Sequence, residues 1–310
     1  MALGSNHVTK TTADKFIPEI WSDEIIAAYK ANLVAANMFS KMSFKGKKGD
    51  TLHIPKPTRG SASVKAASTQ VTLIAATETE QQVLIDKHYE YSRLIEDIVE
   101  TQALASLRKF YTDDAGYALA KQVDTDLIQL GRTVGSGTAY STAASSTNAF
   151  IGSNGTTVYN SSSSNAAALT DAGIRRSIQR LDDADVPMTD RCMIVPPSTR
   201  NTLMGIARFT EQAFVGEQGS ANTIRNGMIG DIYGVMSYVS TNADSGAGSS
   251  GADRICLLAH KDAFVLAEQM GVRSQTQYKQ EYLGTLFTSD MLYGVAELRD
   301  SSAVALAVPA

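Results

Sequence analysis

The sequence predicts an α+β fold in which helices and antiparallel strands are mixed along one chain. Three observations predict it: an apolar stripe at helical spacing over residues 104–130, alternating apolar and polar residues at 51–54 and 83–91, and short strand-like runs in the last third. With 310 residues, 43% of them hydrophobic, the chain is long enough to bury a large core. We find no tandem repeat.

The first predicted element is an amphipathic helix that follows an extended arm. Apolar residues recur at three- and four-residue steps from Phe16 to Phe44, and Ser22 followed by two acidic residues is typical of a helix start. We therefore expect a helix over about residues 22–36. The polar residues before it predict an arm.

Two strands then enclose a segment that has no core of its own. A turn at 45–50 leads into a strand that ends at Pro55, and a second strand over 83–91 places Val83 and Ile85 on one face. Residues 58–80 between them are rich in small and β-branched side chains and too long for an ordinary hairpin turn. We expect either a disordered loop or a long hairpin that completes its packing on another molecule.

The central part of the chain combines a long helix with a polar insertion. The stripe over 104–130 predicts a helix of roughly 40 Å that ends at Gly131. The residues after Gly135 are biased to Ser, Thr, Asn and Gly, which predicts an exposed insertion with little core.

Shorter elements complete the α+β pattern. We expect a helix from Thr170 to about Ala184, a buried strand over 192–195, and a helix with Ser198 as its N-cap. Four strands follow, separated by a Gly/Ser loop at 243–252. Their expected ranges are 232–239, 255–258, 272–282 and 294–308.

Catalytic and cofactor-binding patterns are not found in the sequence. The four histidines are far apart, and no Gly-x-Ser-x-Gly elbow or complete phosphate-binding loop occurs. Cys192 and Cys256 lie in apolar runs, so we expect both to be buried and reduced. We predict no enzyme activity, no cofactor and no metal.

Charge and hydropathy limit the partners. The net charge is −4 and charged residues make up 19%, so we expect only weak, non-specific contact with DNA. The acidic cluster at 182–185 favours a solvated turn over a divalent-cation site. The lysines and arginine of 45–65 make that segment locally basic, which suits an acidic protein surface. No segment is long and apolar enough to span a membrane.

The order of these elements resembles the major capsid proteins of tailed bacteriophages, whose fold is named after phage Hong Kong 97. The resemblance rests on the arm residues 16–22, the strand at 49–57, the helix over 104–130 and three later motifs. Those motifs are Gly230–Val235 leading to Val239–Asn242, Ala259–Phe264, and Leu292–Ala296.

This resemblance implies a division of the chain. Residues 1–45 would be the N-terminal arm, 46–85 the extended loop lying over a neighbouring subunit, and 86–132 with 256–310 the peripheral domain with its spine helix. Residues 133–255 would be the axial domain, including the Ser/Thr-rich insertion.

The function implied is a shell protein that assembles into hexamers and pentamers around double-stranded DNA. We expect its contacts with other subunits to include Phe16, Trp21, Lys56, Arg59 and Lys65. The family also suggests a covalent link from Lys56 or Lys65 to a neighbouring asparagine, which the spacing does not require. Expected partners are a separate scaffolding protein, a portal and, in some relatives, a decoration protein. Assembly would take place in the host cytoplasm, and the product would be the virion capsid.

Two alternatives are left open. An encapsulin-type cellular compartment has the same fold and would enclose a cargo enzyme. A hydrolase or ligand-binding module using the loop at 133–165 would need convergent polar side chains that the sequence does not display.

Overall fold

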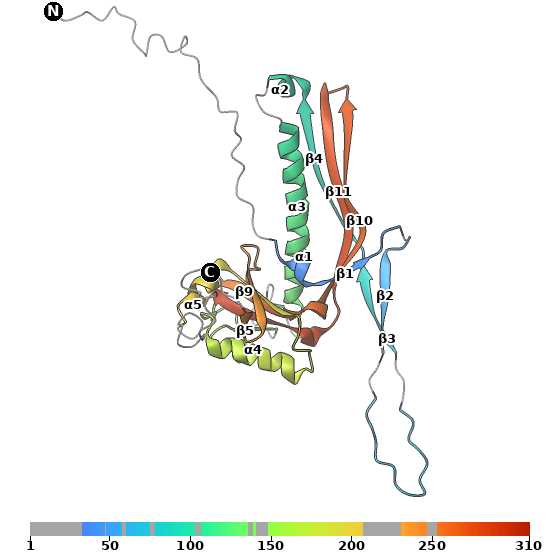
Figure 1. Cartoon of the computed structure of the whole chain (residues 1–310), viewed down its shortest axis with the longest axis vertical. Helices are drawn as coiled ribbons and strands as arrows, with labels where there is room; N and C mark the ends of the chain where they lie inside the picture. Colours follow the sequence, from blue (N-terminus) through green and yellow to red (C-terminus); the bar gives the residue numbers. More distant parts are fainter. Residues whose placement is uncertain are drawn as a thin grey trace, which may run out of the picture.

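A computed structural model describes residues 33–46, 48–57, 60–74, 78–102, 107–135, 139–140, 148–206, 231–246 and 253–310. Within these residues the chain forms a long helix, two large sheets and a projecting hairpin (Figure 1). Helices and mainly antiparallel strands are mixed, which confirms the predicted α+β class.

The long helix α3 runs from Leu107 to Gln129 and continues as a 3-10 turn, η2, over Leu130–Arg132. Ala115, Leu119, Val123 and Leu127 of the predicted stripe are at most 5% exposed. Because these positions share one helical face, the stripe packs on the core while the opposite face meets solvent. The prediction of a long helix is confirmed over its described residues.

A ribbon of four strands lies along α3 (Figure 1). Its order is β1–β10–β11–β4, with β1 parallel to β10 and the other pairs antiparallel. The bounds are Ser40–Ser43 for β1, Lys87–Glu96 for β4, Phe264–Lys279 for β10 and Gly284–Glu297 for β11. The short helix α2, Asp97–Gln102, follows β4 at the far end of the ribbon.

The second sheet has six strands in the order β5–β12–β9–β6–β8–β7. They are β5 Ala149–Ile151, β6 Arg191–Val195, β7 Asp231–Ile232, β8 Val235–Val239, β9 Asp253–His260 and β12 Ala303–Pro309. Strands β9 and β12 therefore lie in one sheet with strands of residues 133–255. The sequence-based division assigns β12 and most of β9 to the other range, 256–310. The domain boundaries in the family's terms stay a prediction.

This sheet is covered on both faces. Cys192 and Ile194 of β6 face the core that contains the α3 stripe, whereas Met193 and Val195 face the core under the helices α4, Asp171–Asp183, and α5, Pro197–Met204. Strand side chains alternate between faces, so a strand buried on both sides is apolar throughout. The expected burial of both cysteines is confirmed.

The Ser/Thr-rich insertion contains more core than expected. Tyr140 and Tyr159 are fully buried with Ile255 and the alanines of β12. Their hydroxyls donate to Asp244 at 2.9 Å and Asp253 at 2.6 Å. The prediction of little core is therefore wrong for this part, because two aromatic anchors fix a segment whose composition is otherwise polar. Residues 136–138 and 141–147 lie outside the described residues.

Several predicted boundaries also differ. The described part of the 22–36 helix contains only α1, Ala35–Met38, and the predicted strand over 83–91 is the end of β3 followed by β4. The range 232–239 is a β7–β8 hairpin turning at Tyr233 and Gly234, both with positive φ. The range 294–308 is the end of β11, a 3-10 turn η4 at Asp300–Ser302, and β12. The predicted strand over 272–282 begins earlier, because β10 starts at Phe264.

Candidate assembly surfaces

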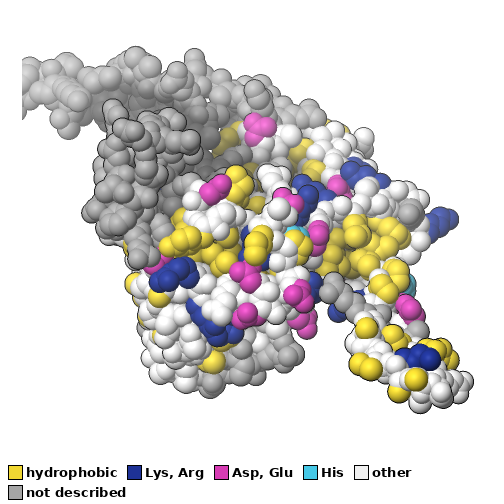
Figure 2. Space-filling view, turned by 60° about the horizontal axis from the view of Figure 1, so that its bottom comes forward, with side chains coloured by type: hydrophobic (Ala, Val, Ile, Leu, Met, Phe, Trp, Pro, Cys, Tyr) yellow, Lys and Arg dark blue, Asp and Glu magenta, His cyan; other side chains and the backbone are white. Residues whose placement is uncertain are grey.

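The hairpin of β2, Thr51–Lys56, and β3, Thr79–Leu84, projects from the body (Figure 1). The strands pair antiparallel from Thr51 with Leu84 to Lys56 with Thr79, so of the two alternatives expected from the sequence the structure shows the hairpin. Beyond them, the whole loop 60–74 is exposed and turns at Ser68, where Thr69 donates to the Ala66 carbonyl. Figure 2 shows this arm standing clear of the body with hydrophobic side chains on its end.

Four large apolar side chains of the loop 60–74 meet solvent. They are Val64, 101% exposed, Val71, 62%, Leu73, 89%, and Ile74, 62%. Exposed apolar side chains gathered on a projecting element are typical of a contact with another protein. The loop 60–74 is therefore a candidate contact surface.

The base of the hairpin is fixed to the body. Val83 and Ile85 are buried against Val265 and Ala267 of β10, and the Gln269 amide donates to the Gly49 carbonyl at 2.9 Å. The backbone of β11 also passes close by, since a Cβ added at Gly294 would collide with the Leu84 carbonyl oxygen. The β2–β3 hairpin is thus fixed to the body at its base, and its end has no contact with the body among the described residues.

Replacing Gly294 with alanine is expected to destabilise this base. The obstructing atom is backbone, which cannot rotate away, so the hairpin or β11 must shift at a cost of about 1–3 kcal/mol. Gly116 is the matched control: it lies in the interior of α3 with nothing within 4 Å of its added Cβ, so Gly116→Ala should stabilise by about 1 kcal/mol. Urea unfolding of the two variants measures both changes, and a neutral Gly294→Ala would contradict the close approach.

A second exposed apolar surface lies at the far end of the ribbon. It is formed by the end of β4, by α2 and by the β10–β11 turn, and we call it the ribbon tip (Figure 1). Its exposed members are Leu94, Ile98, Val99, Tyr278, Tyr282 and Leu283. The Tyr278 hydroxyl donates to Asp97 at 2.8 Å, and the Asp97 amide donates to the Leu283 carbonyl at 3.0 Å. These bonds hold the turn against α2, so the apolar side chains are presented on an ordered support.

Sequence reasoning missed the ribbon tip. The signal available was the run Tyr282-Leu283 at a strand-to-strand turn, where polar residues are the rule. The sequence alone does not show where this run lies, because it is the antiparallel pairing of Gly284 with Glu96 that brings the turn beside α2.

Buried carboxylates on α3 connect the helix to both sheets. Asp124 Oδ1 accepts from the backbone amides of Val34 at 2.9 Å and Ala35 at 2.7 Å, and its Oδ2 accepts from Asn242 at 2.9 Å. Two residues on, Asp126 accepts from the Tyr293 hydroxyl at 2.7 Å and pairs with Lys87 at 3.1 Å. Burial raises the pKa of Tyr293, which keeps the hydroxyl a donor. The helix is thereby tied to the ribbon on one side and to the β8–β9 connection on the other.

Glu297, at the end of β11, predicts a pH effect on stability. Its Oε1 is buried without a hydrogen-bond partner among the described residues, while Oε2 accepts from Thr133 at 3.2 Å. Burial, with a smaller contribution from Asp300, raises its pKa to about 7. The folded chain then binds this proton more tightly than the unfolded chain, in which the pKa is about 4.3, so stability should fall as pH rises from about 4.5 to 7.

The variant Glu297→Gln removes this titration and isolates its effect. From pH 5 to pH 8 the Tm of the variant should rise relative to the Tm of the unaltered protein, because only the unaltered protein loses stability as Glu297 ionises. If the difference in Tm between the two proteins stays the same from pH 5 to pH 8, ionisation of Glu297 does not lower the stability of the fold.

The predicted contact residues are only partly described. Lys56 and Lys65 are exposed on the projecting arm, whereas Phe16, Trp21 and Arg59 lie outside the described residues. The structure of one chain brings none of these side chains to a partner, so their roles stay predictions. Asp182 of the acidic cluster pairs with Arg191 at 2.7 Å.

Among the described residues, no group of three or more His, Cys, Asp or Glu side chains is placed to hold a metal ion. Burial raises the pKa of Cys192 and of Cys256 to about 12, so neither thiol supplies thiolate near neutral pH. The helices in this part of the chain include none with the length and apolar content needed to cross a bilayer.

Comparison with known proteins decides the family. A family model described as "Phage capsid protein" matches residues 42–306. The chain belongs to the phage capsid protein family. The match spans the projecting hairpin, α3 and both sheets, so the surfaces described above belong to a capsid protein. The family also supports neither the encapsulin-type compartment nor the hydrolase alternative.

Solved phage structures share the fold over nearly the whole chain. A chain from Mycobacterium phage Che8 is 23% identical, with a TM-score of 0.74, and the match covers 94% of this chain and 97% of that one. The capsid of cyanophage P-SCSP1u is 20% identical, with a TM-score of 0.74 and coverage of 99% and 96%. The acid-stable capsid of Helicobacter pylori bacteriophage KHP30 is 12% identical, with a TM-score of 0.73 and coverage of 99% and 100%. The predicted Hong Kong 97-type fold is confirmed, and no curated protein matches this capsid chain.

Proposed function

We propose that copies of this capsid protein assemble through hexamers and pentamers into the closed icosahedral head of a tailed phage, which encloses double-stranded DNA. The observation that carries the proposal is the exposure of the loop 60–74, where four large apolar side chains of the projecting hairpin are not covered by their own subunit. Two similar solved structures, those of bacteriophage PhiM1 and cyanophage Pam1, are capsid asymmetric units, which supports self-association. The role is structural, without catalysis.

Two segments of the chain make contacts with neighbouring subunits. Residues 46–85 lie over a neighbouring subunit, and residues 1–45 form a second clasp. Apolar side chains supply most of the affinity of such contacts, while Lys56, Arg59 and Lys65 favour an acidic neighbour surface. In this assignment 86–132 with 256–310 make the peripheral domain and 133–255 the axial domain, with β9 and β12 joining the two through the six-stranded sheet.

Charge fits a shell wall that faces packed DNA. A net charge of −4 gives little attraction for phosphate, so DNA contacts are non-specific and do not hinder packaging or release. Assembly takes place in the bacterial cytoplasm with a scaffolding protein and a portal.

Electron microscopy of the expressed chain, with and without scaffold, tests this proposal. Closed particles or ring-shaped capsomers are expected under negative stain, with matching early elution on size exclusion. A protein that stays monomeric at all concentrations, with scaffold present, would overturn it.

A further inference from the structure

Strand β4 is an edge of the four-stranded ribbon that lacks the usual protection against pairing with another chain. Among the described residues it pairs only with β11, regularly from Lys87 with Tyr293 to Glu96 with Gly284. Edge strands are commonly shortened, or interrupted by proline or a bulge, because their free backbone groups otherwise pair with a further strand. β4 has ten residues, no proline and no bulge, whereas β1, β5 and β7, the other edges of the two large sheets, have four, three and two residues.

The backbone bonds at the end of β4 show which of its residues face outward. The Asp97 amide donates to the Leu283 carbonyl, so these two opposed residues form a hydrogen-bonded pair. Hydrogen-bonded and non-hydrogen-bonded pairs alternate along an antiparallel ladder, so the odd-numbered residues of β4 bond to β11. The even-numbered residues direct their N–H and C=O groups away from the ribbon, and they are all exposed: His88, Glu90, Ser92, Leu94 and Glu96.

Helix α3 covers one face of β4 and not its edge. The Tyr91 hydroxyl of β4 donates to Asp114 at 2.9 Å, and the Tyr293 hydroxyl of the neighbouring β11 donates to Asp126 at 2.7 Å. Because α3 bonds to side chains of both strands, it lies over the face that they share. The backbone of β4 is therefore open on the side away from β11 in the part of the chain that the structure describes.

A second copy of β4 fits this edge. Two copies related by a twofold axis perpendicular to the sheet pair antiparallel, and outward-facing residues must oppose outward-facing residues. With Ser92 opposite Ser92, every pair is compatible. His88 then lies opposite Glu96, Glu90 opposite Leu94, Tyr89 opposite Ile95, and Tyr91 opposite Arg93. Opposite-charge, aromatic–apolar and cation–aromatic pairs across two strands are each stabilising.

Other registers bring like charges together. A centre at Glu90 opposes two carboxylates, a centre at Arg93 opposes two guanidinium groups, and a centre at Tyr91 sets Asp86 against Glu96. Like charges directly opposite each other destabilise a pair of strands, and shifts further toward either end leave fewer pairs within β4. The charged side chains of β4 therefore favour the register centred on Ser92.

We propose that β4 pairs with β4 of a second copy of this chain, antiparallel and with Ser92 at the twofold axis. The two ribbons then form one continuous sheet, with α3 of each copy on the same face. This pairing rests on the proposed function, since it requires that copies of the chain associate, and it adds one specific contact between them.

Disulfide trapping tests the pairing and its register in the full chain under assembly conditions. Hydrogen-bonded pairs have Cα atoms about 5.5 Å apart, within the range of a disulfide, so mild oxidation of Ser92→Cys should give a linked dimer on a non-reducing gel. Glu90→Cys and Leu94→Cys are the matched controls. Each alone places its two thiols about 14 Å apart along the strands and should stay unlinked, whereas a mixture of the two chains should link.

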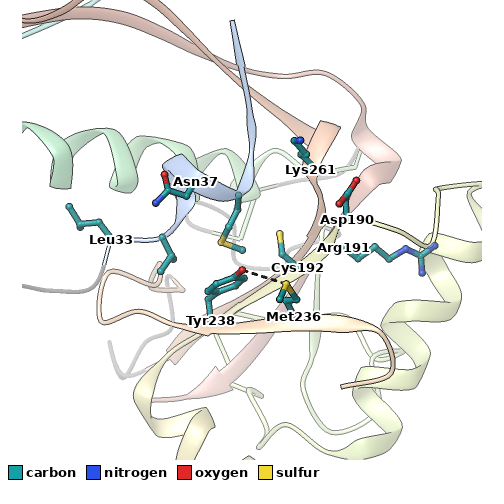
Figure 3. Close-up of a pocket in the computed structure, with 10 residues that line it drawn as sticks. Leu33, Asn37, Asp190, Arg191, Cys192, Met236, Tyr238 and Lys261 are labelled. Carbon is teal, nitrogen blue, oxygen red and sulfur yellow. Dashed lines mark hydrogen bonds between the residues drawn. The ribbon is translucent and has the colours of Figure 1, made fainter. Parts of the chain in front are cut away.

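The native thiols do not interfere with this trap. Cys192 lies beside Met236 and Tyr238 in the wall of a pocket of about 440 Å³ on the six-stranded sheet (Figure 3). Cys256 is fully buried. Burial raises the pKa of both thiols to about 12, so they react slowly near neutral pH.

A proline at the centre tests whether backbone bonds make the contact. The Ser92 N–H points away from β11, so Ser92→Pro should keep the ribbon folded, as circular dichroism measures. Added to both chains of the mixture of Glu90→Cys and Leu94→Cys, it should lower the linked fraction about tenfold, because the central hydrogen bonds are lost. Ser92→Ala keeps the N–H and should leave the linked fraction unchanged. A linked fraction that Ser92→Pro does not lower would contradict backbone pairing.

The outcomes separate this contact from the proposed shell. Shells that form without the expected links would overturn the pairing of β4 and leave the proposed function intact. Links without shells would support the pairing while the proposed function fails, and a chain that gives neither would overturn both. Equal linkage of Ser92→Cys, Glu90→Cys and Leu94→Cys would indicate random collision and overturn the register.

Discussion

Shell assembly is expected to fail, with the subunit still folded, when the four exposed apolar side chains of the loop 60–74 are replaced by serine. These are Val64, Val71, Leu73 and Ile74. Each such side chain contributes about 1.5–3 kcal/mol when a partner buries it, and the loss recurs at every copy in a shell. Their exposure in the single subunit means that the fold itself loses little.

The matched control changes as many polar residues on the same arm to alanine. Ser61, Ser63, Gln70 and Thr72 are also exposed, so this variant should assemble at normal yield. Electron microscopy and sedimentation measure shells, and circular dichroism measures the fold. Deletion of residues 58–78, with the strands closed by Asn-Gly, should likewise give folded subunits without shells. Normal shells from the serine variant or the deletion would show that the loop is not an assembly element.

The variant Asp124→Ala should lower the free energy of unfolding more than any other single change considered for this chain. Asp124 is fully buried and accepts from three donors, the amides of Val34 and Ala35 and the Asn242 side chain. Leaving a buried donor unsatisfied costs about 1–3 kcal/mol, so we expect a loss on the order of 3–5 kcal/mol.

Asp124→Asn separates the hydrogen bonds from side-chain volume. Its remaining oxygen still accepts from the backbone amides, whereas its amide group faces the Asn242 amide and loses that bond. Urea unfolding should therefore place Asp124→Asn between the unaltered protein and Asp124→Ala. Equal losses in the two variants would show that the backbone bonds to Val34 and Ala35 contribute little.

Periodicity predicted the elements whose partners are close in the chain or whose burial is uniform. The stripe of α3 and the apolar run of β6 follow directly from their spacing. The helix predicted from Thr170 is α4, and the Thr170 side chain caps it by accepting from the Gly173 amide at 3.3 Å. Such signals are local, so the sequence contains them in full.

Boundaries set by distant contacts were not predictable in the same way. The alternation of apolar and polar residues continues from Val83 to Tyr91. However, β3 pairs with β2 and β4 pairs with β11, and the alternation does not change where one strand ends and the next begins. Ser198 does not cap α5: Pro196 occupies that position, and the Ser198 hydroxyl donates to the Pro309 carbonyl at the end of the chain. Helix α1 begins where Asp124 captures two amides from far along the sequence.

The two candidate surfaces also differ in whether the sequence could predict them. The loop 60–74 was predictable because its composition cannot form a core, whereas the ribbon tip forms only once the β10–β11 turn lies beside the end of β4 and α2.

The register shifts in β10 have a mechanical consequence. Pairing with β11 is regular from Phe264 to Glu268 and from Arg273 to Lys279, and it slips between these stretches. A β-bulge interrupts the ladder and bends a strand locally, so β10 bends between two regularly paired stretches, while β11 stays paired with β4 throughout. Copies that meet flat or sharply curved parts of a shell are expected to differ in angle at this point. Both regular stretches of β10 keep their hydrogen bonds to β11 on either side of the bulge, so a change of angle there would not require the ribbon to unfold.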